Sequence, residues 1–134
     1  MSDTVLTFGC LVAGLAALIH VYIWLLESVL WMHPTTRRTF GVRTAEDAET
    51  LRPMAYNQGF YNLFLALGVV VGLVLVWSGL RLPGLVLLLF VCVSMVLAAL
   101  VLLTTNRRML RAALVQGLAP LLAVAAFVVA LASA

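Results

Sequence analysis

The hydrophobic positions of this chain fall into four long runs separated by short polar segments. The runs cover about residues 5–32, 56–77, 84–104 and 109–132, and each is long enough to cross a bilayer as a helix, which takes about 20 residues. The longest connection is the segment 33–55. The pattern predicts an all-α integral membrane protein, a bundle of four transmembrane helices that forms one domain over residues 1–134.

A few polar residues interrupt these runs, and they gather at one depth. Counting about 1.5 Å per residue from the ends of the predicted helices places Glu27 roughly 7 Å inside the bilayer. The same rise places the block Asn57–Asn62, NQGFYN in one-letter code, at roughly 5 to 12 Å, and Gln116 at roughly 10 Å. All three lie toward the same side because consecutive helices run in opposite directions. The other half of the bilayer is predicted to be almost free of polar side chains.

Helical spacing indicates which of these residues share a face. Residues three and four apart form one stripe on the first helix: Gly9, Ala13, Ala16, His20, Trp24, Glu27 and Trp31. Small residues let membrane helices approach closely, so this stripe is predicted to face protein. The second helix has a comparable stripe: Asn57, Tyr61, Phe64, Gly68 and Gly72. Asn57 and Asn62 diverge by roughly 140°, which predicts different partners, with Asn57 the better placed to face the first helix.

Two prolines and a capping pattern refine the helix ends. Thr44 to Asp47 fits a capping box that opens a short helix through Arg52, and Pro53 is suited to the first turn of the second membrane helix. Pro120, inside the fourth helix, leaves the backbone carbonyl of Gln116 without its usual partner.

Composition and charge give the orientation. The chain is 65% apolar, with a net charge of +3 and a pI near 9.4. Seven of its eight arginines lie in the first and third connections: Arg37, Arg38, Arg43, Arg52, Arg107, Arg108 and Arg111. Because positive charge stays on the cytoplasmic side, the segment 33–55 is predicted to be cytoplasmic and both termini to lie on the outer side. The arginines therefore need no nucleic-acid partner.

The polar residues that gather at this depth, with two neighbouring tryptophans, are the candidate site residues. The predicted ligand-binding residues are Glu27, Asn57, Gln58, Tyr61, Asn62, Gln116, Trp24 and Trp31. Glu27 is the strongest of them, since burying a carboxylate is costly and a glutamine would form the same hydrogen bonds more cheaply. The alternative for Asn62 and Gln116 is a structural one, in which amide hydrogen bonds fix helix packing. His20 fits a satisfied core histidine.

We predict no metal and no cofactor. Cys10 and Cys92 both lie inside apolar runs, where such thiols behave as small hydrophobic residues. The chain contains no zinc-ligand spacing and no phosphate-binding glycine motif.

Several functions are compatible with this pattern. The first is binding of a small amphiphilic or lipophilic molecule in a polar pocket in the cytoplasmic half of the bilayer. An acid–base enzyme, isomerase-like, with Glu27 and His20 as catalytic candidates is the second, although the two lie about 10.5 Å apart along the helix axis. An oligomeric proton-coupled transporter and a structural subunit of a larger complex are the others. Expected partners are membrane lipids and further copies of the chain, because small-residue stripes favour self-association.

The quoted residues also resemble a known family. Glu27 with Trp31, Phe40, the NQGFYN block leading to Gly68, and Gln116 to Pro120 (QGLAP) are similar to a family of small bacterial four-helix membrane proteins catalogued as a domain of unknown function, number thirteen-zero-four. The resemblance spans most of the chain. It implies the four-helix fold and a multi-pass protein of the bacterial plasma (inner) membrane, and it implies no particular activity.

Overall fold

Four long helices account for most of the computed structural model, which describes residues 3–133. The first helix, α1 (Asp3–Trp24), continues directly into a π-helical turn (Leu25–Val29). A short helix α2 (Pro34–Thr39) precedes the long helix α3 (Ala45–Trp77). The chain then forms α4 (Arg81–Thr105), a 3₁₀ turn (Arg107–Met109) and α5 (Leu110–Ala132).

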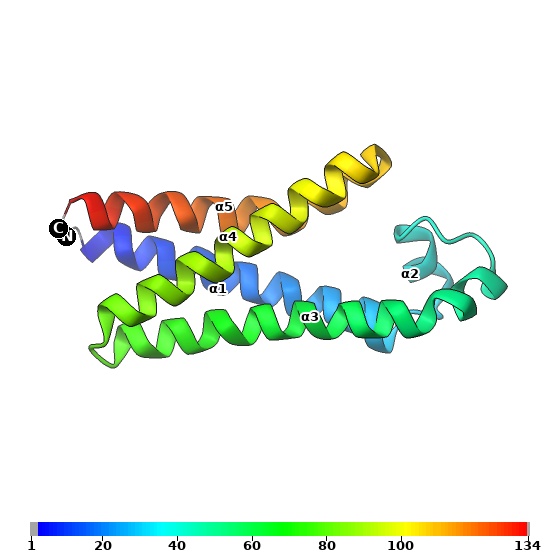
Figure 1. Ribbon diagram of the computed structural model, residues 1–134, viewed down its shortest axis with the longest axis horizontal. Coiled ribbons are helices and arrows are strands. Elements are labelled where there is room, and N and C mark those ends of the chain that lie inside the picture. Colours follow the sequence, from blue (N-terminus) through cyan, green and yellow to red (C-terminus); the bar gives the residue numbers. More distant parts are fainter. Residues whose placement is uncertain (1–2, 134) are drawn as a thin grey trace.

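The long helices form a bundle in which consecutive helices run in opposite directions. Each packs against its neighbours in the chain, α5 closes the ring against α1, and α1 and α4 face each other diagonally with few contacts. Both ends of the chain and the α3–α4 turn lie at one end of the bundle, whereas α2 and the α4–α5 turn lie at the other (Figure 1). We call these the terminal end and the arginine end, because the second holds seven of the eight arginines.

The helices change partners along the length of the bundle. At the terminal end α1 lies beside α5 and α3 lies beside α4, while toward the arginine end α4 diverges from α3 and α1 approaches α3 (Figure 1). The closest packing agrees with this arrangement: Gly9 of α1 lies against Phe127 of α5, and Gly59 of α3 lies against Ser28 in the π-helical turn.

All four long helical segments are long and apolar enough to cross a membrane: Asp3–Val29, Ala45–Trp77, Arg81–Thr105 and Arg107–Ala132. The prediction of an all-helical bundle with four apolar helices of membrane-spanning length is therefore confirmed. The exterior suits this environment, because large hydrophobic side chains such as Leu18, Phe90 and Val101 are exposed all around the bundle, as contact with lipid tails requires.

The second membrane helix starts earlier than predicted. α3 begins at Ala45 and passes through Pro53 without a break. Thr44 does cap it, since its hydroxyl accepts a hydrogen bond from the backbone N–H of Asp47 at 3.0 Å. Pro53 removes the helix hydrogen bond to the carbonyl of Glu49, and because Glu49 is exposed, that carbonyl is not left in the apolar interior and the helix continues. At about 1.5 Å per residue α3 is roughly 50 Å long, more than the bilayer core of about 30 Å requires.

The interior of the bundle consists mainly of small residues. Seven buried alanines belong to its core cluster, together with Cys10 and Cys92: Ala13, Ala16, Ala17, Ala66, Ala119, Ala123 and Ala130. In a membrane, helices associate through close van der Waals contact and not through exclusion of water. Alanine permits that contact, so the predicted protein-facing stripe of α1 is confirmed, with Gly9, Ala13 and Ala16 all buried.

Glycines allow α3 and α4 to pack with backbone close to backbone. A Cβ at Gly84 would lie 2.7 Å from Val76 Cγ2 and 2.8 Å from the carbonyl oxygen of Gly72. A Cβ at Gly68 would lie 2.9 Å from Val91. The GxxxG pair Gly68 and Gly72 therefore packs against α4 of the same chain. The small-residue stripe of α3, which suggested self-association, is thus occupied by helix packing within one copy of the chain.

This packing gives a stability prediction. We expect Gly84→Ala to lower the free energy of unfolding by about 1–3 kcal/mol, because the new methyl group meets backbone atoms that have no room to move. Gly14→Ala is the matched control, since nothing lies within 4 Å of its added Cβ and alanine favours a helix by about 1 kcal/mol over glycine. Thermal unfolding of the purified variants in detergent measures both. Equal unfolding temperatures for the two variants would contradict the close approach.

Candidate functional site

A carboxylate and an amide meet between the π-helical turn and α3. Asn62 Nδ2 donates a hydrogen bond to Glu27 Oε2 at 2.9 Å, and it also donates to the carbonyl oxygen of Gln58 at 3.2 Å. Both Glu27 and Asn62 are half-buried. Asn62, and not Asn57, is thus the amide that faces the first helix, so the preference for Asn57 was wrong.

The helix geometry of α3 explains this difference. Its buried face runs through Ala48, Ala55, Gly59 and Ala66, and Asn62 lies three residues after Gly59, on the same face. Asn57, by contrast, is exposed on the side that points away from the first helix. Because α3 is continuous from Ala45, its helical spacing fixes which of its side chains face the first membrane segment.

The π-helical turn shapes the first wall of the site. The backbone N–H of Leu30 bonds to the carbonyl of Leu25 at 2.8 Å, the wider repeat of a π turn. Such turns add one residue to a helix and are frequent at functional sites. Here the extra residue lets two neighbours, Glu27 and Ser28, both meet α3. Ser28 Oγ donates to the carbonyl oxygen of Tyr56 at 3.0 Å.

Gly59 makes the second contact possible. A Cβ at this position would overlap Ser28 Oγ and would lie 3.1 Å from Glu27 Cβ. The glycine of the NQGFYN block therefore admits the serine hydroxyl and the glutamate stem. Sequence reasoning missed both Ser28 and this role of Gly59, although an isolated glycine between polar residues in a membrane helix signals a close backbone approach.

Three aromatic side chains pack together on the neighbouring turns of α1 and α3. Trp24 meets Phe60 edge-on, with ring centroids 6.1 Å apart, and Phe60 also lies 5.0 Å from Tyr56. The Nε1 atom of Trp24 is buried and has no hydrogen-bond acceptor among residues 3–133. Trp24 ends α1 and Glu27 follows three residues later in the π-helical turn, so a buried indole N–H and a carboxylate occur within one turn of the chain.

Trp31 fixes the end of the first membrane segment. Its indole Nε1 donates to the carbonyl oxygen of Ala48 at 2.8 Å, and its ring lies 5.5 Å from that of Phe40. Trp31 is 6% exposed. It joins the connection around α2 to the first turns of α3, so its observed contacts are structural.

The remaining predicted site residues lie apart from this pair. Gln58 and Tyr61 are exposed on α3, as Asn57 is. Gln116 is half-buried on α5, which packs against α1 and α4 but not closely against α3. No hydrogen bond joins Gln116 to Glu27 or Asn62 within residues 3–133. The four helices therefore do not close around a single polar pocket. The polar residues predicted at one depth are divided between two helix pairs.

His20 lies deeper, inside α1. It is 1% exposed, and its Nδ1–H donates to the carbonyl oxygen of Ala16 at 2.8 Å. No hydrogen bond or ion pair connects it with Glu27 in the described part of the chain. The ring is thus satisfied by its own helix, the structural arrangement expected of a core histidine.

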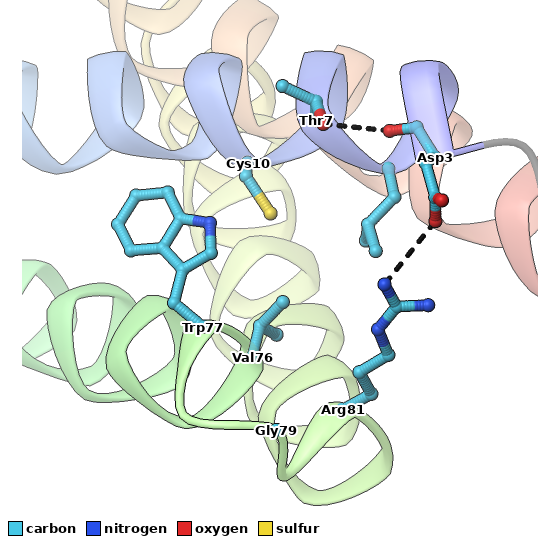
Figure 2. Close-up of a pocket in the computed structure, with 8 residues that line it drawn as sticks. Asp3, Thr7, Cys10, Val76, Trp77, Gly79 and Arg81 are labelled. Carbon is cyan, nitrogen blue, oxygen red and sulfur yellow. Dashed lines mark hydrogen bonds and ion pairs between the residues drawn. The ribbon is translucent and has the colours of Figure 1, made fainter.

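Glu27 does not line either of two surface hollows that lie at opposite ends of the bundle. The larger, about 490 Å³, lies at the arginine end and is lined by Leu103, Thr104, Arg107 and Leu110. The other, about 280 Å³, lies at the terminal end, where Asp3, Arg81, Cys10 and Trp77 surround it (Figure 2). Arg81 pairs with Asp3 at 3.3 Å across its rim (Figure 2). Both partners are largely exposed, so this pair contributes little stability.

The chemistry available at the Glu27 site is hydrogen bonding. Asn62 holds one carboxylate oxygen, and the other has no hydrogen-bond partner within residues 3–133. Within the same range no group of three or more His, Cys, Asp or Glu side chains is arranged to hold a metal ion. The site offers an acceptor on Glu27 and a donor on Trp24, both facing an apolar surrounding.

Comparison with known proteins gives one match. The sequence profile of a family described as "Protein of unknown function (DUF1304)" matches residues 14–128. No curated protein and no solved structure shows significant similarity to the chain. The matched range includes Glu27, Ser28, Gly59 and Asn62.

The carboxylate–amide contact can be tested as a coupling energy. We expect the double-mutant cycle of Glu27→Ala and Asn62→Ala to give a coupling of about 0.6 to 1.7 kcal/mol, the range of hydrogen bonds between membrane helices. The cycle of Glu27→Ala with Asn57→Ala is the control and should give a coupling near zero, because Asn57 points away. Unfolding of the purified proteins in mixed micelles measures both cycles. Equal couplings would show that Asn62 has no special contact with Glu27.

Proposed function

The chain belongs to the DUF1304 family of proteins of unknown function, and from its own site we propose that it binds a small amphiphilic molecule within the membrane. In this proposal Glu27 holds the polar head of the molecule, and the apolar tail lies along the lipid-facing surface toward the terminal end. The family supplies the fold but no activity, so the argument depends on the site.

The contact between Glu27 and Asn62 carries the proposal. A carboxyl group inside a membrane segment is costly and is kept chiefly where it does something. If Glu27 only tied two helices together, a glutamine would accept the same hydrogen bond from Asn62 Nδ2 at a lower cost. The free carboxylate oxygen instead leaves an acceptor at a half-buried position.

Trp24 indicates the kind of head group. Its buried N–H has no acceptor among the described residues, and a buried unsatisfied donor costs about 1–3 kcal/mol. A ligand with a hydroxyl or an amide would serve both groups, because it would donate to Glu27 and accept from Trp24. Phe60 and Tyr56 supply apolar surface beside this head group.

Catalysis and transport find less support. The two catalytic candidates, Glu27 and His20, do not touch, and His20 already donates to Ala16. Transport needs polar groups across the whole membrane, but on α1 the segment from Phe8 to Ile19 carries no charged, amide or hydroxyl side chain. Binding requires neither feature.

We also propose the orientation and location of the protein. The arginine end is placed in the cytoplasm, because loops rich in arginine stay there, and the plasma membrane of a bacterium is the membrane proposed. The Glu27 site then opens toward the cytoplasmic leaflet. In this proposal a ligand reaches Glu27 from that leaflet.

Ligand binding can be measured by native mass spectrometry of protein purified in mild detergent. We expect a specific small-molecule adduct on the unchanged protein and a decrease on the order of ten-fold in Glu27→Gln, the effect of losing a hydrogen bond to a charged group. Glu46→Gln is the matched control, since it makes the same change at an exposed carboxylate. Identical adducts on all three proteins would refute the proposal.

The orientation can be tested separately. A reporter enzyme that is active only outside the cytoplasm, fused after Ala134, should be active, because the C-terminus is placed on the outer side. The same reporter inserted after Gly41, in the connection around α2, should be inactive. The reverse pattern would invert the proposed topology and move the Glu27 site to the other leaflet.

A further inference from the structure

The α4–α5 turn carries three arginines without an ion pair in the described part of the chain. Arg107 and Arg108 lie in the 3₁₀ turn and Arg111 lies in the first turn of α5, and all three are exposed. The two side-chain ion pairs that residues 3–133 form are elsewhere, between Arg52 and Glu49 and between Arg81 and Asp3. This turn is therefore positively charged, and no acidic side chain neutralises it.

The turn is also well defined. Asn106 caps it, since its side-chain oxygen accepts a hydrogen bond from the backbone N–H of Arg108 at 3.2 Å. The backbone N–H of Met109 bonds to the carbonyl of Asn106 at 2.9 Å. These bonds fix the backbone from which Arg107 and Arg108 diverge, so neighbouring arginines have different surroundings.

Arg107 is the arginine that lines the hollow of about 490 Å³, together with Leu103, Thr104 and Leu110. Thr104 is not an available donor there, because its hydroxyl already donates to the carbonyl oxygen of Val101 at 3.0 Å. The hollow thus combines one free guanidinium with leucine side chains, at the end of two membrane-spanning segments. This is the chemistry of an anionic head group with a hydrocarbon tail attached.

We propose that this hollow binds the phosphate group of an anionic phospholipid. The guanidinium of Arg107 donates to the phosphate oxygens as a planar fork, which suits phosphate better than a point charge does. Leu103 and Leu110 contact the beginning of the acyl chains. Arg108 and Arg111 add attraction to the negatively charged leaflet without contacting the head group directly.

This site is separate from the one proposed at Glu27. Glu27 lies between the π-helical turn and α3, whereas the hollow lies on α4 and the α4–α5 turn. A carboxylate would repel an anionic head group, so the two sites select molecules of different charge. Each proposal can fail without affecting the other.

The test compares two single-charge variants. Protein in mixed micelles that contain equal amounts of phosphatidylglycerol and phosphatidylcholine is analysed by native mass spectrometry. We expect phosphatidylglycerol to be the preferred adduct, and R107Q to lower its affinity by about ten-fold or more, the loss of a charge-assisted hydrogen bond. R108Q should lower it by at most about five-fold, the effect of one interfacial charge. Unchanged helix content and unfolding temperature confirm that both variants fold.

Each other outcome overturns the proposal. Equal losses in R107Q and R108Q would mean a diffuse basic surface without a specific site, and no loss in R107Q would mean that Arg107 does not bind the head group. Inorganic phosphate, added in large excess, should leave the lipid adduct in place because it lacks a tail. Displacement by phosphate would indicate a site for a soluble anion.

Discussion

Alanine and glycine line the interior of this bundle, and the remaining features depend on the close helix contact that they allow. Without water to drive them together, membrane helices associate only where their surfaces fit at short range. Gly84 against Gly72 and Gly9 against Phe127 bring the helices to that range at the terminal end. The α1–α5 and α3–α4 pairs are fixed there, so the helices are free to exchange partners at the other end. That exchange is what brings the first membrane segment onto α3.

The side-chain hydrogen bond between Glu27 and Asn62 lies at the end where the helix pairs separate. There the π-helical turn replaces the regular α-helix, and Glu27 and Ser28 meet α3 where glycine and asparagine replace alanine. The charged groups are separated as well, with a carboxylate between the α1–α3 pair and unpaired arginines on the α4–α5 turn. One small bundle thus carries a half-buried acidic group and an exposed basic turn at the same end, on different helix pairs.

Most of the fold could be predicted from the sequence, but the site could be predicted only in part. Four apolar runs and the small-residue stripe of α1 were sufficient to give the bundle and its buried face. Depth along each helix correctly grouped Glu27 with the NQGFYN block. The sequence did not predict which side chains of the block face the first membrane segment. That depends on the register of α3, and the register follows from a helix that passes through Pro53. The π-helical turn has no sequence signature, so Ser28 was missed. Gln116 was grouped with Glu27 by depth alone, although α5 and α3 are not neighbours.

The length of α3 has a mechanical consequence. This helix begins at Ala45, after the Thr44 cap in the hydrophilic connection, and runs without interruption to Trp77 at the terminal end. Trp31 ties the end of the first membrane segment to its early turns, and Asn62 ties Glu27 to it further along. The helix is continuous from its hydrophilic first turns to its buried part. A displacement of those first turns is therefore passed along α3 to Asn62 and to the Glu27 side chain that it holds.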